Sequence, residues 1–262
     1  MDINLTVKKS FFNEAYLPYL ENKERITVFY GGAGSGKSVF AVQKMIIKYM
    51  KNPDRTCLVV RKASAQIRDS IFAEYKSQLN RFGILQYCSV VATTMQIELP
   101  NGSKFIFKGI DDPEKIKSIH GIDDIMIEEA TQISKDDFTQ LGLRMRSRKP
   151  NQQIVMMFNP VSKSNWVYKT FFAQEPPVDT VIIKTTWLDN KFLPPEYVAS
   201  LEDMKRTNPV YYQIYALGEF ASLGKLVYTN WRVRLRQKNA LIKKGYKYLF
   251  GLDFGLTLSP CT

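Results

Sequence analysis

The sequence predicts an α/β fold in which a mostly parallel β-sheet carries helices on both faces. Three observations lead to this fold class. Apolar strand-like runs alternate along the chain with segments whose apolar residues recur every three or four positions. A glycine-rich turn at residues 31–38 joins the first strand-like run to the first helical segment, as in a parallel strand–helix unit. With 262 residues, 45% of them apolar, the chain can also bury a large core.

The first part of the chain contains two strand–helix units. Residues 26–30 form an apolar run that predicts a strand, and the apolar spacing that follows predicts a helix over 39–50. Residues 56–60 predict a second buried strand. A polar segment with one apolar stripe then predicts a helix over 64–82 that ends at Gly83.

A β-hairpin is expected to interrupt this series. Residues 95–99 and 104–108 alternate between polar and apolar side chains, and they flank Asn101-Gly102, a dipeptide typical of tight hairpin turns. The alternation of strand and helix then resumes. Its elements are a strand at 124–128, a helix at 135–145, a strand at 153–158, a helix at 165–172 and a strand at 180–184.

The C-terminal part of the chain differs in composition. Two proline pairs, Pro176-Pro177 and Pro194-Pro195, precede helical segments at 196–206 and 210–217, which predict a small helical subdomain. Residues 248–254 predict one more strand. We therefore expect three parts, namely a core at 1–184, a helical subdomain at 185–245 and the start of a further domain at 246–262.

The glycine-rich turn matches the pattern G-x-x-x-x-G-K-[ST] of a phosphate-binding loop. Small residues let successive backbone N–H groups turn toward a polyphosphate at a helix N-terminus, whose dipole favours negative charge. We expect Lys37 to reach the β- and γ-phosphates of ATP and Ser38 to hold Mg²⁺. The predicted nucleotide-binding residues of this loop are Gly31, Gly32, Ala33, Gly34, Ser35, Gly36, Lys37 and Ser38.

Two carboxylates end the predicted strand at 124–128. Glu128 is expected to hold Mg²⁺ or its coordinated water, and Glu129 to polarise the water that attacks the γ-phosphate. An ordinary strand end before an acidic helix start is the alternative. Asn159 ends the next predicted strand, where it would sense the γ-phosphate, although Asn159-Pro160 is equally compatible with a turn. These acids extend the prediction to an ATP-hydrolysing P-loop NTPase of the ASCE type, which has a catalytic glutamate.

The chain is strongly basic, with 37 Lys and Arg against 25 Asp and Glu and a net charge of +12. This excess predicts a polyanionic partner, nucleic acid first and an anionic membrane second, unless it only keeps the surface soluble. Three cysteines without C-x-x-C spacing and a single histidine, His120, argue against a disulfide framework or zinc site. No signal peptide and no apolar run of ~18 residues is present, so we expect an intracellular protein that does not enter the membrane.

Several motifs occur in the order found in phage terminase large subunits. They are the phosphate loop, Pro100-Asn101-Gly102, residues 109–118, Glu128-Glu129-Ala130-Thr131, Phe158-Asn159-Pro160 and residues 208–220. Over nearly its whole length the chain resembles the packaging ATPase of a tailed phage or prophage. The resemblance implies a homo-oligomeric ring that moves double-stranded DNA into a procapsid in the host cell cytoplasm, with a portal protein and a terminase small subunit as partners. It also implies that residues 185–245 form a lid or linker subdomain.

The same resemblance implies further site residues. Phe12, Asn13 and Arg25 would contact the adenine, although Phe12 is also compatible with a core position. Many relatives carry an arginine inside the phosphate loop, where this chain has Ala33, so the arginine finger that stabilises transition-state charge must lie elsewhere. Its candidates are Arg61, Arg68, Arg144 and Arg146, with Lys117 as a weaker one, although each is also compatible with a surface charge.

In this family an RNase H-like nuclease domain follows the ATPase, and residues 251–255 resemble its first strand. Asp253 would then be one ligand of an incomplete nuclease metal site, because two-metal cleavage needs several carboxylates from different strands. We therefore expect this chain to lack nuclease activity. Two other functions stay open, namely a DNA helicase or remodelling ATPase, and a scaffold that binds ATP without hydrolysing it.

Overall fold

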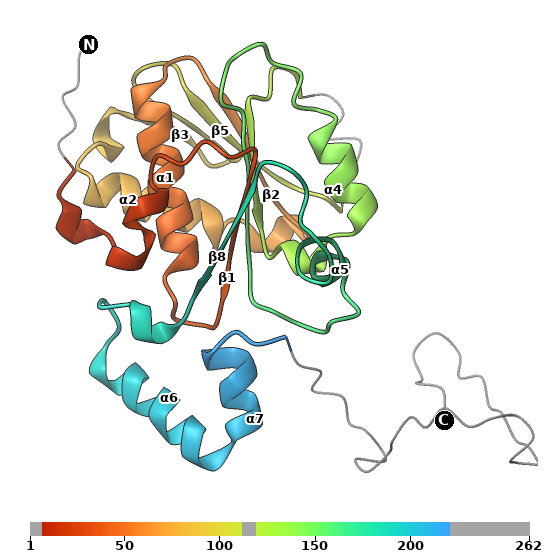
Figure 1. Ribbon diagram of the computed structural model, residues 1–262. Helices are drawn as coiled ribbons and strands as arrows, with labels where there is room; N and C mark the ends of the chain where they lie inside the picture. Colours follow the sequence, from red (N-terminus) through yellow and green to blue (C-terminus); the bar gives the residue numbers. More distant parts are fainter. Residues whose placement is uncertain (1–6, 112–118, 221–262) are drawn as a thin grey trace, which may run out of the picture. The chain divides into compact units, whose positions relative to one another are not determined.

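The computed structural model describes residues 7–111 and 119–220 of the chain. The predicted strand at 248–254, Lys117 and Asp253 lie outside the described residues. Within the described part, the strands form a single sheet with helices on both faces (Figure 1). None of the described helices combines the length and the apolar character needed to cross a lipid bilayer.

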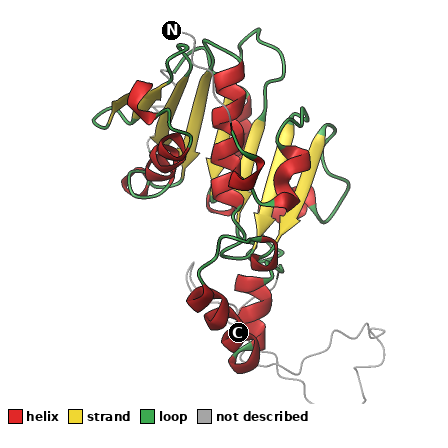
Figure 2. Cartoon of the chain, turned by 90° about the vertical axis from the view of Figure 1, so that its left-hand side faces the viewer, coloured by secondary structure: helices red, strands yellow, loops and turns green. Residues whose placement is uncertain are grey.

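The strands of the sheet are ordered β3-β4-β5-β2-β6-β7-β1-β8. In this order, every neighbouring pair in the stretch β5-β2-β6-β7-β1-β8 runs parallel. At the other edge of the sheet, β4 pairs antiparallel with both β3 and β5 (Figure 2). Parallel strands joined by helical crossovers confirm the predicted α/β class. The bounds are β1 Ile26–Gly31, β2 Thr56–Arg61, β3 Ser89–Val91, β4 Gln96–Glu98, β5 Lys104–Gly109, β6 Asp124–Glu128, β7 Ile154–Phe158 and β8 Thr180–Thr185.

Helices cover the sheet from both sides. α1 (Lys37–Lys51) and α2 (Ile71–Arg81) pack on one face, and α4 (Lys135–Gly142) and α5 (Trp166–Phe171) pack on the other (Figure 1). Each of the two layers has its own apolar core because successive residues of a strand point to opposite faces. The buried central strands are therefore apolar on both sides, as expected for a parallel sheet.

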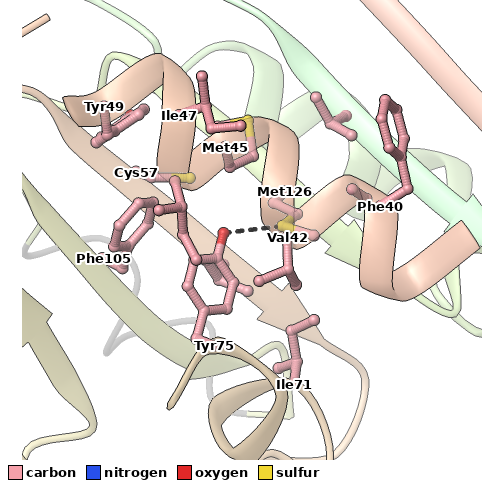
Figure 3. Close-up of a cluster of buried hydrophobic side chains, with 14 of the residues drawn as sticks. Phe40, Val42, Met45, Ile47, Tyr49, Cys57, Ile71, Tyr75, Phe105 and Met126 are labelled. Carbon is pink, nitrogen blue, oxygen red and sulfur yellow. Dashed lines mark hydrogen bonds between the residues drawn. The ribbon is translucent and has the colours of Figure 1, made fainter. Parts of the chain in front are cut away.

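Strand β2 shows this division directly. Cys57 and Val59 belong to the core beneath α1 and α2, whereas Leu58 and Val60 belong to the core beneath α4 and α5. In the first of these cores the Tyr75 hydroxyl lies 3.1 Å from the sulfur of Met126, to which it donates a hydrogen bond (Figure 3). This contact satisfies a polar group that α2 would otherwise bury without a partner.

The helix predicted over 64–82 is shorter than expected. A 3₁₀ turn at Ser64–Gln66 precedes α2, which starts only at Ile71. Ser64 donates both its backbone N–H and its hydroxyl to the Asp111 carboxylate, and these bonds hold the segment in a turn. At the other end the prediction is confirmed, because Gly83 has a φ of 72° and closes a Schellman motif.

The predicted hairpin is confirmed, but it extends the sheet instead of standing beside it. β5 pairs antiparallel with β4 and parallel with β2, so the hairpin is continuous with the parallel strands. β3 is not predicted from the sequence, because all three of its residues are exposed and lack the alternation that marks a strand. α4 ends at Gly142 and not at 145, since glycine is a poor helix former.

The last described elements are helical. α6 (Pro195–Thr207) is followed by α7 (Pro209–Tyr211), which continues into a π-helical turn at Tyr212–Ala216. Together with Trp187 and Leu201, these segments form an apolar cluster of their own, separate from the two cores of the sheet. A small core of its own is expected for a lid or linker subdomain. The boundaries of that subdomain at 185 and 245 stay predictions.

Candidate nucleotide-binding site

The phosphate loop joins β1 to α1 at the carboxyl edge of the parallel strands, where open α/β sheets bind their ligands. Gly34 and Gly36 have φ values of 75° and 79°, in the left-handed region that favours glycine. Gly36 directly precedes Lys37, the first residue of α1. The N–H groups of the loop therefore lie at a helix N-terminus, which is the electrostatic setting that phosphate binding needs.

Two other glycines of the loop permit close packing. A Cβ atom on Gly31 would lie 1.7 Å from the carbonyl oxygen of Thr185, and one on Gly32 would lie 2.0 Å from that of Ala216. The backbone N–H of Ala33 donates to the carbonyl oxygen of Tyr215 at 2.6 Å. The π-helical turn at Tyr212–Ala216 thus contacts the phosphate loop backbone to backbone. From the sequence, these glycines are predicted only to bind phosphate, because the residues that they pack against are distant in the chain.

Side chains from two other segments brace the loop from outside. Asn190 Nδ2 donates to the carbonyl oxygen of Gly34 at 2.7 Å, and Asn13 Nδ2 donates to Asn190 Oδ1 at 3.0 Å. The Tyr16 hydroxyl donates to the carbonyl oxygen of Ser35 at 3.1 Å. Asn13 is among the residues predicted by resemblance, and the structure places it beside the loop. Tyr16 and Asn190 are new, since no local motif marks either of them.

Lys37 lies where the loop passes into α1 and is buried, with 7% of its surface exposed. Its Nζ donates to the carbonyl oxygen of Gly32 at 3.2 Å and to Oδ1 of Asn159, which follows β7. Burial lowers the pKa of the Lys37 amine to about 8, and the nearby Glu129 carboxylate opposes that shift. The structure thus brings together three predicted site residues from distant segments.

The lowered pKa of Lys37 predicts a pH dependence of nucleotide binding. Phosphate oxygens beside the amine stabilise its charged form and raise its pKa, so binding of ATP above about pH 8 takes up a proton. ATP affinity should then fall by up to about tenfold per pH unit above pH 8, and this group should have no effect below about pH 7. Titration calorimetry in buffers of different ionisation enthalpy measures the uptake, and its absence near pH 9 would contradict the assignment.

The two predicted acids lie where β6 ends. Oε2 of Glu128 accepts hydrogen bonds from Arg61 Nη1 and from Ser70 Oγ, each at 3.0 Å. Burial raises the pKa of Glu128, and the Arg61 guanidinium is the largest influence in the opposite direction. Glu129 follows with a φ of 53°, a left-handed conformation that costs about 1 kcal/mol or more for a non-glycine residue. Strain of this kind is typical of functional sites.

Ser38 and Glu128 face the same cleft, which has a volume of about 310 Å³ and also contains Ser70 and Glu74. The hydroxyl and carboxylate oxygens on its walls are the hard ligands that Mg²⁺ prefers. Ser38 lies in the first turn of α1, directly after Lys37, whereas Glu128 comes from β6. The fold therefore joins the two predicted metal ligands around one space, although they lie far apart in the sequence.

The arginine-finger candidates have different environments. Arg61 contacts Glu128 of its own chain, and its side chain is 16% exposed. Arg68 and Arg146 are exposed and donate to backbone carbonyl oxygens, and Arg144 is half-buried. Because a finger that enters a neighbouring subunit has to be exposed, Arg68 and Arg146 fit that role better than Arg61 does. Arg61 instead donates a hydrogen bond to the Glu128 carboxylate of its own chain.

Replacement of Arg61 by alanine is expected to lower ATP turnover by about tenfold or more with little effect on ATP affinity. Loss of the cation removes the charge that opposes the raised pKa of Glu128, so the acid limb of the pH–rate profile should move to higher pH. Arg61→Lys should restore part of the activity. Arg206→Ala, at an exposed arginine on α6, is the control. An unchanged pH profile for Arg61→Ala would remove Arg61 from the site.

Two of the residues predicted to contact adenine are placed elsewhere. Phe12 is buried in the core, where its ring packs against those of Phe40 and Phe82, so the alternative interpretation of Phe12 holds. Arg25 directly precedes β1, at the amino edge of the sheet, and donates to the carbonyl oxygen of Gln152 at 3.1 Å. The length of β1 separates it from the phosphate loop, and the prediction for Arg25 is therefore wrong for a site within one chain.

The sequence profile described as phage terminase large subunit matches residues 23–219. The chain belongs to the phage terminase large subunit family. A curated relative, the PBSX phage terminase large subunit of Bacillus subtilis strain 168, is 32% identical over 93% of this chain and 61% of its own length. The large subunit of the Bacillus phage SPP1 terminase is 26% identical over 89% of this chain and 58% of its own. The chain thus spans about three fifths of the length of these curated relatives.

Solved structures of other terminases have the same fold. The large terminase of a thermophilic bacteriophage, solved in complex with ADP, has a TM-score of 0.69 at 15% identity, over 80% of this chain and 54% of that one. The ATPase domain of the Thermus phage P74-26 large terminase has a TM-score of 0.62 at 15% identity, over 83% of this chain and 100% of that domain. The fold of this terminase family member is therefore the ASCE P-loop fold.

Proposed function

We propose that this chain is the ATPase part of a viral genome-packaging motor, which hydrolyses ATP to move double-stranded DNA into a procapsid. The observation that carries this proposal is the gathering of Lys37, Glu128, Glu129 and Asn159 at the carboxyl ends of β1, β6 and β7, which are neighbours in the sheet. Membership of the phage terminase large subunit family supports the same function.

Each of these residues has a part in the proposed reaction. The Lys37 amine binds the β- and γ-phosphates, and the Glu129 carboxylate orients the attacking water and accepts its proton. Asn159 bonds to the Lys37 amine, so arrival of a γ-phosphate at that amine changes the bonding of Asn159. Asn159 thereby senses whether the γ-phosphate is present.

The reaction also uses Mg²⁺, which the Ser38 hydroxyl and the Glu128 carboxylate would hold. When bound there, the ion neutralises charge on the phosphate oxygens. Arg61 keeps the Glu128 carboxylate in place through the hydrogen bond at 3.0 Å. Ser70 bonds the same oxygen, so two donors fix the orientation of the acid.

A second cleft beside the loop suits the base and ribose of the nucleotide. It has a volume of about 280 Å³ and is bordered by Asn13, Gly36 and Arg81. The Arg81 guanidinium lies 5.0 Å from the ring centre of Phe11 and 4.9 Å from that of Phe192. A flat aromatic and cationic wall of this kind suits stacking on an adenine ring.

The family supplies the rest of the proposal. The motor works as a homo-oligomeric ring in the host cell cytoplasm, with double-stranded DNA, a portal protein and a terminase small subunit as partners. The ATPase core at 1–184 acts with a lid or linker subdomain at 185–245, and 246–262 begin the nuclease domain. In the ring, an exposed arginine such as Arg68 or Arg146 enters the site of the adjacent subunit.

The proposal is tested by measuring ATP turnover and oligomeric state with and without linear double-stranded DNA. We expect DNA to stimulate turnover and to promote assembly. Turnover accompanied by separation of a forked duplex into single strands would favour the helicase alternative. Tight ATP binding without any turnover, with or without DNA, would instead support a nucleotide-binding scaffold.

A further inference from the structure

A strongly basic cleft lies at the amino edge of the sheet, opposite the nucleotide site. It has a volume of about 380 Å³ and is formed by the segments that precede β1, β7 and β8. Four cations line it, Lys23, Arg25, Arg148 and Lys149, against one carboxylate, that of Asp179. We call these four cations the amino-edge basic surface. The other residues that line the cleft are Ser147, Asn151 and Gln152, so no apolar side chain forms its wall.

Most of the positive charge on this surface has no carboxylate partner. Within residues 7–111 and 119–220, no ion pair is formed by Lys23, Arg25 or Arg148, whereas Lys149 lies 3.9 Å from Asp123. Lys23 and Arg148 are exposed to solvent. Unpaired exposed cations gathered in one cleft create a positive potential that attracts an anionic partner.

A neighbouring cleft of about 230 Å³ shares Lys23 and Asn151 with this one, but its other cations are already bound. Lys48 and Arg55 lie 2.7 and 3.3 Å from the buried Asp124 carboxylate. Lys44 donates to backbone carbonyl oxygens, which leaves it no free hydrogen for a ligand. The neighbouring cleft is therefore structural. Among the cations that line the two clefts in the described part of the chain, Lys23 and Arg148 are free to bind a ligand, whereas Arg25 and Lys149 already contact other groups of the chain.

The loop that carries Arg148 and Lys149 is held in place by hydrogen bonds. The Ser147 hydroxyl donates to the buried Asp123 carboxylate, and Gln152 Nε2 donates back to the Ser147 carbonyl oxygen at 2.6 Å. Arg25 in turn binds Gln152 through its carbonyl and side-chain oxygens, both at 3.1 Å. Fixing the loop beforehand reduces the entropy that a ligand must overcome on binding.

We propose that the amino-edge basic surface binds the phosphate backbone of double-stranded DNA. The inference rests on the proposed packaging function, to which it adds the place of DNA contact. An open, polar cleft lined by several cations suits a chain of phosphodiesters, which are read by charge and not by sequence. A membrane would require apolar side chains that enter the lipid, and the cleft has none on its wall.

The surface is separate from the ATP site. Arg25 precedes β1 and the phosphate loop follows it, so the six residues of that strand, at ~3.3 Å each, place the two sites about 20 Å apart. Charge reversal at the amino edge should therefore leave the groups that bind and hydrolyse ATP untouched. Binding of DNA and hydrolysis of ATP can consequently be measured as independent properties.

The test compares two double variants with the same change in net charge. Lys23→Glu with Arg148→Glu alters the surface, and Lys135→Glu with Lys169→Glu alters exposed lysines on α4 and α5. DNA affinity is measured by fluorescence anisotropy of a labelled duplex over a range of salt concentrations. We expect the surface variant to bind at least tenfold more weakly at low salt and to lower the salt slope by about two. The control variant should retain most of the affinity.

Basal ATP turnover without DNA should be unchanged in both double variants, while DNA stimulation should be lost only in the surface variant. A surface variant with the affinity and salt slope of the control would overturn the proposal. So would loss of self-association with unchanged DNA affinity, which would assign the surface to contact between copies of the chain. A wild-type chain that hydrolyses ATP but binds no DNA would contradict the packaging function itself.

Discussion

Replacement of Glu129 by alanine is expected to abolish ATP hydrolysis while ATP still binds. Glu129 follows β6 directly and lies close enough to Lys37 for its charge to influence the pKa of that amine. A carboxylate beside the γ-phosphate site is the group that orients water for attack, and loss of a general base of this kind costs about 10²- to 10⁴-fold in rate. Single-turnover hydrolysis and equilibrium binding of a fluorescent ATP analogue measure the two effects separately.

A second variant, Glu129→Gln, removes the charge and keeps the shape of the side chain. It also avoids a change in side-chain size at a left-handed position, where φ is 53°. Glu196→Ala, at an exposed glutamate in the first turn of α6, is the matched control and should leave turnover unchanged. Normal turnover in Glu129→Gln would show that another group activates the water.

Replacement of Lys37 by alanine is expected to weaken ATP binding by about 10- to 100-fold, which corresponds to the loss of charge-assisted hydrogen bonds to the phosphates. Hydrolysis at saturating ATP should fall as well, because the amine also stabilises charge in the transition state. Without ATP the variant should stay folded, because it no longer has to bury a charged amine. The cost of that burial is what lowers the pKa of Lys37 to about 8. Calorimetry and thermal unfolding measure these properties.

Lys44→Ala provides a control at the same helix. Lys44 is also buried in α1 and its pKa is also lowered to about 8, but its Nζ donates to the carbonyl oxygens of Tyr19 and Leu20, away from the phosphate loop. This variant should lose stability, because three backbone carbonyl oxygens lose the amine that donates to them, but it should keep its ATP affinity. Equal losses of ATP affinity in Lys37→Ala and Lys44→Ala would point to damage of α1 as a whole and would remove the specific role of Lys37.

Local patterns predicted most of the secondary structure because burial leaves a periodic mark on the sequence. The strands β1, β2, β6 and β7 are almost wholly buried and follow the apolar runs closely. Elements that lack this periodic pattern were not predicted, or were predicted with the wrong bounds. β3 is exposed along its length, and the turn before α2 is held by the Asp111 carboxylate, a contact across distant segments.

The site was predictable only where consecutive residues carry its chemistry. The phosphate loop and the pair Glu128 and Glu129 are such segments, and the fold places them at one edge of the sheet. The contact between Arg61 and Glu128 follows from the pairing of β2 with β6, which no local pattern encodes. The predicted role of Arg25 failed for a related reason, since position along the chain does not say at which edge of a sheet a residue lies.

Local sequence patterns were sufficient to predict the α/β class, the phosphate loop and the two acids, because glycine spacing and apolar periodicity reflect forces that act within a few residues. The residues that surround these segments became known only from the three-dimensional fold. It joined Lys37 to Asn159, set the π-helical turn at Tyr212–Ala216 against the loop and gathered the amino-edge basic surface from three segments. Such contacts depend on strand order and on helix packing, which bring together residues more than a hundred positions apart.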